Sequence, residues 1–183
     1  MNFRVLRWVI VALVVVAGLA FLALGANGPA DPTLKAAEGP VSTNNNRTPF
    51  GDYDEIGFRI EGGSASATAA RCALLAETAT QQGRGLMERR DLGGYDGMLF
   101  KFAADHTGEF YMLNTPLPLS IAFFDASGAF VSATDMAPCI DMPTCPTYGA
   151  ARPYRWALEV PRGDLPRLGV GPGTRLVAGG PCR

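Results

Sequence analysis

The chain has 183 residues, 48% of them hydrophobic and 18% charged, and its formal net charge at pH 7 is −1. A chain of this length and composition buries one ordinary hydrophobic core rather than two. Arginine and lysine are scattered and form no basic stripe, so we expect no nucleic-acid partner.

The N-terminal segment, residues 1–26, predicts a membrane anchor or a signal peptide. Two arginines precede an uncharged apolar run from Trp8 to Ala26, and about 20 apolar residues suffice for a helix to cross a bilayer. The run is longer than the usual core of a signal peptide, which favours an anchor, but Ala23 and Gly25 also fit a cleavage site. The arginines favour a cytoplasmic N-terminus. We therefore expect the rest of the chain outside the cytoplasm, held at the cell membrane or, after cleavage, periplasmic or secreted.

Residues 27–53 are expected to form a flexible linker, and residues 54–183 the folded domain. The linker is rich in proline and polar residues and has few large apolar ones. It cannot bury enough apolar surface to offset the entropy lost on ordering.

The pattern after the linker is typical of β-strands, because short alternating runs are separated by turn residues. Thr78 and Gln81 form a possible capping box and predict a short helix that ends near Gly85. Asp164 predicts a second brief helix that stops at Gly169. In chain order, the expected strands are EIGFRIEG, ARCALLAET, GMLFKF, EFYMLN, SIAFFD, AFVSAT, YRWALEV and GTRLVAG.

The four cysteines are Cys72, Cys139, Cys145 and Cys182. An even number in an exported chain indicates two disulfides. Cys139 and Cys145 bracket a short proline-rich loop, so we pair them with each other, which leaves Cys72 with Cys182. Zinc is the competing interpretation, but the spacing lacks the close cysteine pairs of structural zinc sites. We expect no metal and no other cofactor.

Four motifs in series, GRGLMERRDL, GMLF, FYMLNTPLPLSIAFFD and WALEV, resemble a bacterial and archaeal family known as domain of unknown function 192. The resemblance covers about residues 72–177. It implies a compact, mostly antiparallel β fold, sandwich- or barrel-like, with one or two short helices, and it implies no established activity. The family commonly has Lys and Asp where this chain has Leu113 and Ser120, a joint change that we interpret as replacement of a structural pair.

Candidate chemical groups are few. His106 is the single histidine and lies in an expected turn, where exposure to solvent is the favoured interpretation, so we expect no catalytic residue. The methionines of the four motifs are interpreted as core residues rather than copper ligands. Glu159 lies inside an apolar strand and would need a cationic partner if buried, which Arg84 or Arg89 could supply.

The break LNTPLPL between two apolar runs holds Asn114 and Thr115. These side chains either brace the turn or, together with Arg89, line a cleft that binds a neutral or anionic ligand. The favoured function is a non-catalytic binding or interaction module of the cell envelope, with an unknown small ligand or envelope partner. The alternative is a hydrolase-like enzyme of the cell surface with a cleft near Asn114 and Arg89. A deep cleft that holds a carboxyl group of strongly shifted pKa would favour the enzyme.

Overall fold

The structure is a computed structural model that describes residues 46–48, 50, 52–63, 69–140 and 142–182. The expected anchor or signal peptide, residues 1–26, and most of the expected linker lie outside these residues. Over the described part of the chain, no helix combines the length and the apolar character that a bilayer-spanning helix needs.

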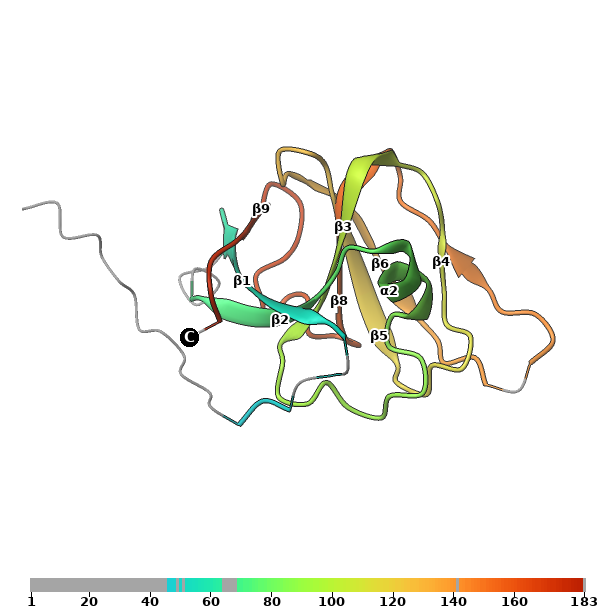
Figure 1. The fold of residues 1–183 in the computed structure, drawn as a ribbon. Coiled ribbons are helices and arrows are strands. Elements are labelled where there is room, and N and C mark those ends of the chain that lie inside the picture. Colours follow the sequence, from blue (N-terminus) through green and yellow to red (C-terminus); the bar gives the residue numbers. More distant parts are fainter. Residues whose placement is uncertain (1–45, 49, 51, 64–68, 141, 183) are drawn as a thin grey trace, which may run out of the picture. The chain divides into compact units, whose positions relative to one another are not determined.

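The expected mostly β fold with little helix is confirmed (Figure 1). The expected strand EFYMLN is reduced to its first two apolar residues, and the strand before it runs on to His106. The elements of the described residues are β1 (Asp54–Glu61), β2 (Arg71–Ala76), α2 (Ala79–Arg84), β3 (Gly97–His106), β4 (Phe110–Tyr111), β5 (Leu119–Phe124), β6 (Phe130–Met136), β7 (Thr147–Tyr148), β8 (Tyr154–Pro161) and β9 (Arg175–Ala178).

The helix α2 begins with the capping box that the sequence predicts. Gln81 N donates to Thr78 Oγ1 at 3.2 Å, and Thr78 N donates to Gln81 Oε1 at 3.0 Å. These two bonds satisfy backbone donors that the first turn of a helix leaves free. The helix ends at Gly85, whose φ of 48° suits glycine.

The second expected helix, at residues 164–169, is a series of turns instead. Leu168 N donates to Asp164 O, and Gly169 N donates to Pro166 O, each at 3.0 Å. Pro166 has no backbone N–H, and a segment this short forms too few i to i−4 bonds to stabilise a helix.

Seven strands form one sheet in the order β6-β5-β8-β3-β2-β1-β9, and β4 pairs with β7 separately. Every pair is antiparallel except β2 with β3, which is parallel. A parallel pair needs a crossover connection. Here the crossover consists of α2 and residues 85–96, and it places α2 against one face of the sheet.

The sheet curls until its two outer strands meet. A β-bridge joins Ala129 to Arg175, and Leu176 N donates to Gly128 O at 2.8 Å. Gly128 has φ +82°, and a Cβ built on it would lie 2.2 Å from Leu176 O. Only glycine therefore allows the two edges to approach this closely.

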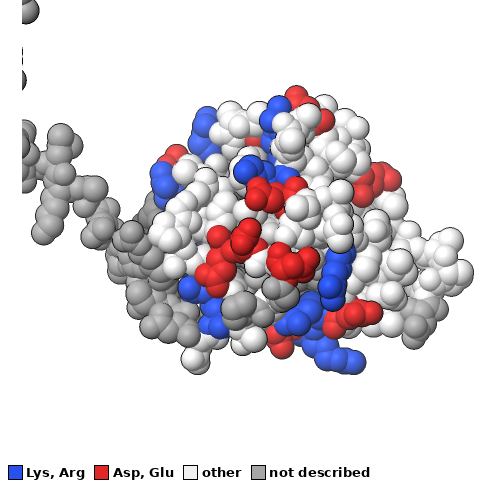
Figure 2. Space-filling model, in the orientation of Figure 1, with Lys and Arg blue, Asp and Glu red and all other residues white. Residues whose placement is uncertain are grey.

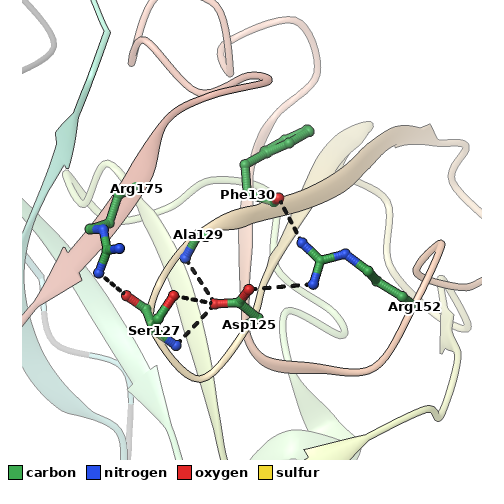
Figure 3. Close-up of polar contacts among 6 residues, drawn as sticks. All are labelled: Asp125, Ser127, Ala129, Phe130, Arg152 and Arg175. Carbon is green, nitrogen blue, oxygen red and sulfur yellow. Dashed lines mark hydrogen bonds and ion pairs between the residues drawn. The ribbon is translucent and has the colours of Figure 1, made fainter.

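The turn at this meeting point is braced by Asp125 (Figure 3). Its carboxyl accepts from the backbone N–H groups of Ser127 and Ala129 at 2.9 and 3.0 Å, and it lies 3.3 Å from Arg152 Nη1. Arg175 donates to Ser127 O at 2.6 Å. Hydrogen bonds from Ser127, Ala129 and Arg152 hold the pKa of Asp125 below its usual value.

Apolar side chains fill both faces of the sheet. One cluster includes Phe58, Leu99, Phe124 and Leu158 and is covered by the turns at residues 164–170. The other cluster includes Leu74, Met98, Phe100, Met112 and Phe123 and is covered by residues 86–95 and by the two-stranded sheet. Because both faces are covered, the central strands have few polar positions.

Phe50 extends the folded part of the chain into the segment that the sequence assigns to the linker. Its side chain is 5% exposed, and its ring contacts the edge of Tyr95 at 6.1 Å between centroids. Thr48 N donates to Gly93 O at 2.8 Å. The fold therefore begins before residue 54.

The structure pairs Cys72 with Cys182 and Cys139 with Cys145, which are the two pairs that the spacing favours. The Cα atoms lie 5.2 and 5.9 Å apart. The first bond ties β2, a strand inside the sheet, to the C-terminal segment 110 residues later.

Candidate functional site

A cavity of about 210 Å³ lies on the face of the sheet that α2 covers. Four parts of the chain line it: α2 with residues 85–87, β3 from Phe100 to His106, residues 109–119, and β8. The parallel crossover brings the first of these parts over the sheet, so the cavity is a product of the topology.

Glu159 on β8 lines this cavity and is 4% exposed. Among the described residues its carboxyl has no hydrogen bond and no ion pair, and burial raises its pKa from 4.5 to about 8. Neither of the two expected cationic partners, Arg84 and Arg89, forms an ion pair with Glu159. At neutral pH a group with this pKa holds its proton.

Aromatic side chains form much of the cavity wall. Phe100 and Phe110 meet edge to face, with ring centroids 4.9 Å apart. Phe102 stacks on His106 at 4.2 Å with an interplanar angle of 8°. His106 is therefore a half-buried residue of the cavity at the end of β3, and the expectation of an exposed turn residue is wrong.

The remaining polar groups lie toward the opening of the cavity. Arg84 and Glu109 are exposed, and Gln82 Nε2 donates to Lys101 O at 2.7 Å. Tyr111 donates to Gly83 O at 3.3 Å across this opening. Among the charged residues of the lining, Glu159 is therefore the deep one, and Arg84 and Glu109 are solvated.

Of the three predicted ligand-binding residues, Thr115 lines the cavity. Its side chain is 4% exposed, and its hydroxyl donates to Leu113 O at 3.3 Å. Asn114 is exposed and is not part of the lining. Its backbone N–H donates to Cys139 O at 2.9 Å, and its φ is 52°.

The carbonyl of Asn114 accepts from Glu88 N at 2.7 Å, and Glu88 also has a positive φ, 62°. These are the non-glycine residues with positive φ in the described part of the chain. Their bond joins the segment after α2 to the segment before β5, and both segments line the cavity. Left-handed backbone at such residues is costly and is held by the surrounding structure.

Arg89, the third predicted residue, lies elsewhere. It lines a smaller cavity of about 60 Å³, where its guanidinium carbon lies 3.3 Å from the ring centroid of Phe50. The structure therefore does not bring Arg89 and Thr115 into one site. Arg89 holds the N-terminal residue Phe50 against the domain by a cation–π contact.

Leu113 and Ser120, the two positions that differ from the common family pattern, have separate surroundings. Leu113 is exposed and forms a bridge with Cys139. The Ser120 hydroxyl donates to the carboxyl of Asp135 and accepts from Gly163 N at 3.0 Å.

Glu159 is not among the three predicted ligand-binding residues, although the sequence holds a signal for it. Glu159 is the charged residue inside the apolar strand sequence WALEV. A charge inside a buried strand is either paired or functional, and the sequence offers Arg84 or Arg89 as a partner. Only the structure shows that the partner is missing and that a cavity lies there instead.

The fold and this cavity define a small, disulfide-bonded β domain whose described residues include one buried acid, Glu159. The chain belongs to the DUF192 family, described as "Uncharacterized ACR", whose profile matches residues 62–178. The resemblance carried by the four motifs is thereby confirmed. No curated protein matches the chain.

Two solved structures are similar to this chain. One, from Sinorhizobium meliloti 1021, is described as a candidate transcription regulator; it is 29% identical, has a TM-score of 0.59, and the match covers 71% of this chain and 98% of that one. The other is a protein of unknown function from Novosphingobium aromaticivorans DSM 12444. It is 24% identical, has a TM-score of 0.54, and the match covers 82% of this chain and 99% of that one. The second likeness concerns the fold alone.

Proposed function

We propose that this chain is an exported binding module that holds a small ligand in the cavity over Glu159. The observation that carries the proposal is a glutamate that is 4% exposed, lines a cavity and has a carboxyl group with no protein partner among the described residues. The carboxyl reaches a cavity that has room for water, and a ligand bound there can replace water as its hydrogen-bond partner.

The size and walls of the cavity support a small ligand. Its volume of about 210 Å³ equals that of about seven liquid water molecules at ~30 Å³ each. Apolar side chains, among them Phe100, Phe102 and Phe110, line the cavity together with as many polar or charged ones, so the cavity offers a small ligand both hydrophobic contact and polar groups.

Two features support a location outside the cytoplasm. The two disulfides belong to an oxidising compartment, and the apolar run at residues 8–26 favours export. A C-terminal fusion to an alkaline phosphatase, which is active only after export, should be active. An inactive, stable fusion would contradict the location and leave the cavity proposal standing.

The ligand is sought by a thermal-shift screen of the full chain against small amines, carboxylates, sugars and neutral alcohols. Gly83 lines the cavity, and a Cβ added there meets no atom within 4 Å. Gly83→Trp should fill the opening and remove any ligand response. Gly171 has the same open surroundings outside the cavity, so Gly171→Trp should keep the response. A response equal in both variants, or absent from wild type, would overturn the proposal.

A second candidate is a cell-surface hydrolase in which Glu159 acts as a general acid. Its raised pKa, about 8, keeps a proton available at neutral pH. This function requires turnover of an ester, amide or glycoside, and Glu159→Gln should abolish that turnover. The binding function requires none.

The charge of this chain does not favour the transcription-regulator role named for the Sinorhizobium protein. The net charge is −1, and acidic and basic side chains are interspersed on the face drawn in Figure 2. A phosphate backbone is bound by a continuous basic surface.

A further inference from the structure

We infer that the ligand of this cavity carries a protonated amine, whose ammonium group pairs with the carboxylate of Glu159 against the surrounding aromatic rings. This inference rests on the proposed binding function and names the chemical class of the ligand.

The charges around the cavity favour a cation. Two of the lining residues, Glu109 and Glu159, are acidic, and one, Arg84, is basic. Arg84 is exposed, so water screens its charge, whereas Glu159 lies at depth, where charge interactions are stronger. A cation that reaches the floor of the cavity stabilises the ionised form of this carboxyl as its counter-charge, and the benzoate control below tests whether the protonated carboxyl binds an anion instead.

The walls favour the same class of ligand. Phe100, Phe102 and Phe110 line the cavity with Glu159. An aromatic face attracts a desolvated cation by about 2 kcal/mol or more, and His106 already covers one face of Phe102. An ammonium group held between a carboxylate and such rings keeps three donors, and the carboxylate accepts one or two of them.

The pairing requires a proton to leave Glu159. Burial raises the pKa of its carboxyl to about 8, so it is neutral in the empty cavity near pH 7. An ammonium group stabilises the ionised form, and one proton goes to solvent as the complex forms. The other titratable groups around the site are Tyr53, whose pKa burial also raises, together with Arg84, His106, Glu109 and Tyr111.

The test measures binding of benzylamine to the full chain, in detergent, by calorimetry between about pH 5 and 8. Benzyl alcohol and benzoate are the neutral and anionic controls of nearly the same size. We expect saturable binding of benzylamine, lost in Gly83→Trp, with an association constant that rises about tenfold per pH unit. Buffers of different ionisation enthalpy should report release of about one proton.

Glu159→Gln should weaken benzylamine binding at least about tenfold near pH 8 and remove its pH dependence. Histidine is the other side chain that ordinarily changes charge in this range. His106→Gln should therefore keep the slope. If the association constant loses its pH dependence in His106→Gln and keeps it in Glu159→Gln, the released proton does not come from Glu159 and the inference is overturned.

The outcomes separate this inference from the proposed function. Cavity-dependent binding of benzyl alcohol or benzoate at least as tight as that of benzylamine would overturn the amine class and leave the binding function intact. Benzylamine binding without proton release would also overturn the inference. Absence of saturable binding by benzylamine overturns it too, and absence of any response in the wider screen removes the binding function as well.

Discussion

Glu159 on β8 lies directly opposite Met98 on β3, and the two side chains are 4% and 0% exposed. On the other side of β8, Glu159 pairs with Ile121 of β5. Directly opposed residues of a sheet are each other's nearest neighbours. The carboxyl therefore emerges between two apolar side chains, and the cavity is where a polar partner can reach it.

The first prediction concerns stability against pH in the absence of ligand. The pKa of Glu159 is about 8 in the folded state against an ordinary 4.5, so between these values the folded protein keeps a proton that the unfolded chain releases. This contribution is fully present below about pH 4.5, and it falls by up to about 1.4 kcal/mol per unit until about pH 8.

Glu159→Gln should remove this dependence and raise the free energy of unfolding above that of wild type by on the order of 5 kcal/mol near pH 9. Urea titrations over this range measure it. Glu109→Gln, a change at an exposed carboxyl of the same cavity, should keep the wild-type slope. An unchanged slope in Glu159→Gln would show that its pKa is not raised.

The second prediction concerns Gly128, where the two edges of the sheet meet. Gly128 and Gly173 have φ of +82° and +80°, but only Gly128 has an atom, Leu176 O, in the way of a Cβ. Gly128→Ala and Gly173→Ala should each lower the free energy of unfolding by about 1 kcal/mol, because alanine is strained in left-handed backbone. Gly128→Ala should cost at least about 2 kcal/mol more because the edges must separate. Equal melting temperatures of the two variants would contradict the close approach.

The third prediction concerns the exposed residue Asn114. Its φ is 52° and its bonds are made by the backbone. Asn114→Gly should therefore be neutral or stabilising, whereas Asn114→Ala should cost about 1 kcal/mol. Chemical denaturation measures both. If the side chain braces the turn instead, Asn114→Gly will be the more harmful change.

The fourth prediction compares the two disulfides. The bond between Cys72 and Cys182 closes 110 residues, and that between Cys139 and Cys145 closes 6. By the loop-entropy relation, replacing both cysteines of a pair by serine should cost about 4.7 kcal/mol for the long loop and about 2 for the short one. Non-reducing peptide mapping should first show these two pairs. Any other pairing of the four cysteines, or free thiols, in protein purified from its own host would contradict the pairs in the structure.

The fifth prediction concerns Phe50. Its buried ring belongs to the core cluster and carries Arg89 on its face. A chain that begins at Asn46 should be more stable than one that begins at Asp54 by about 3 kcal/mol, the usual cost of losing a buried phenylalanine. Phe50→Ala in the longer chain should reproduce most of that loss. Equal stability of all three would place Phe50 outside the core.

The sequence by itself determined the features that depend on neighbouring residues. Alternation of apolar and polar residues predicted the β strands, and Thr78 with Gln81 predicted the start of α2, because both patterns are read within one element. The four motifs determined the family. The spacing of Cys139 and Cys145 also favoured the pairs that the structure forms.

Only the tertiary structure decided what depends on residues far apart in the chain. The parallel pairing of β2 with β3 sends α2 across the sheet and makes the cavity, and strand patterns carry no information about pairing order. The same arrangement leaves Glu159 without the partner that a buried charge usually has, and it directs Arg89 to Phe50 instead. Burial and partner choice are properties of the packed fold, because they depend on which surfaces it brings together.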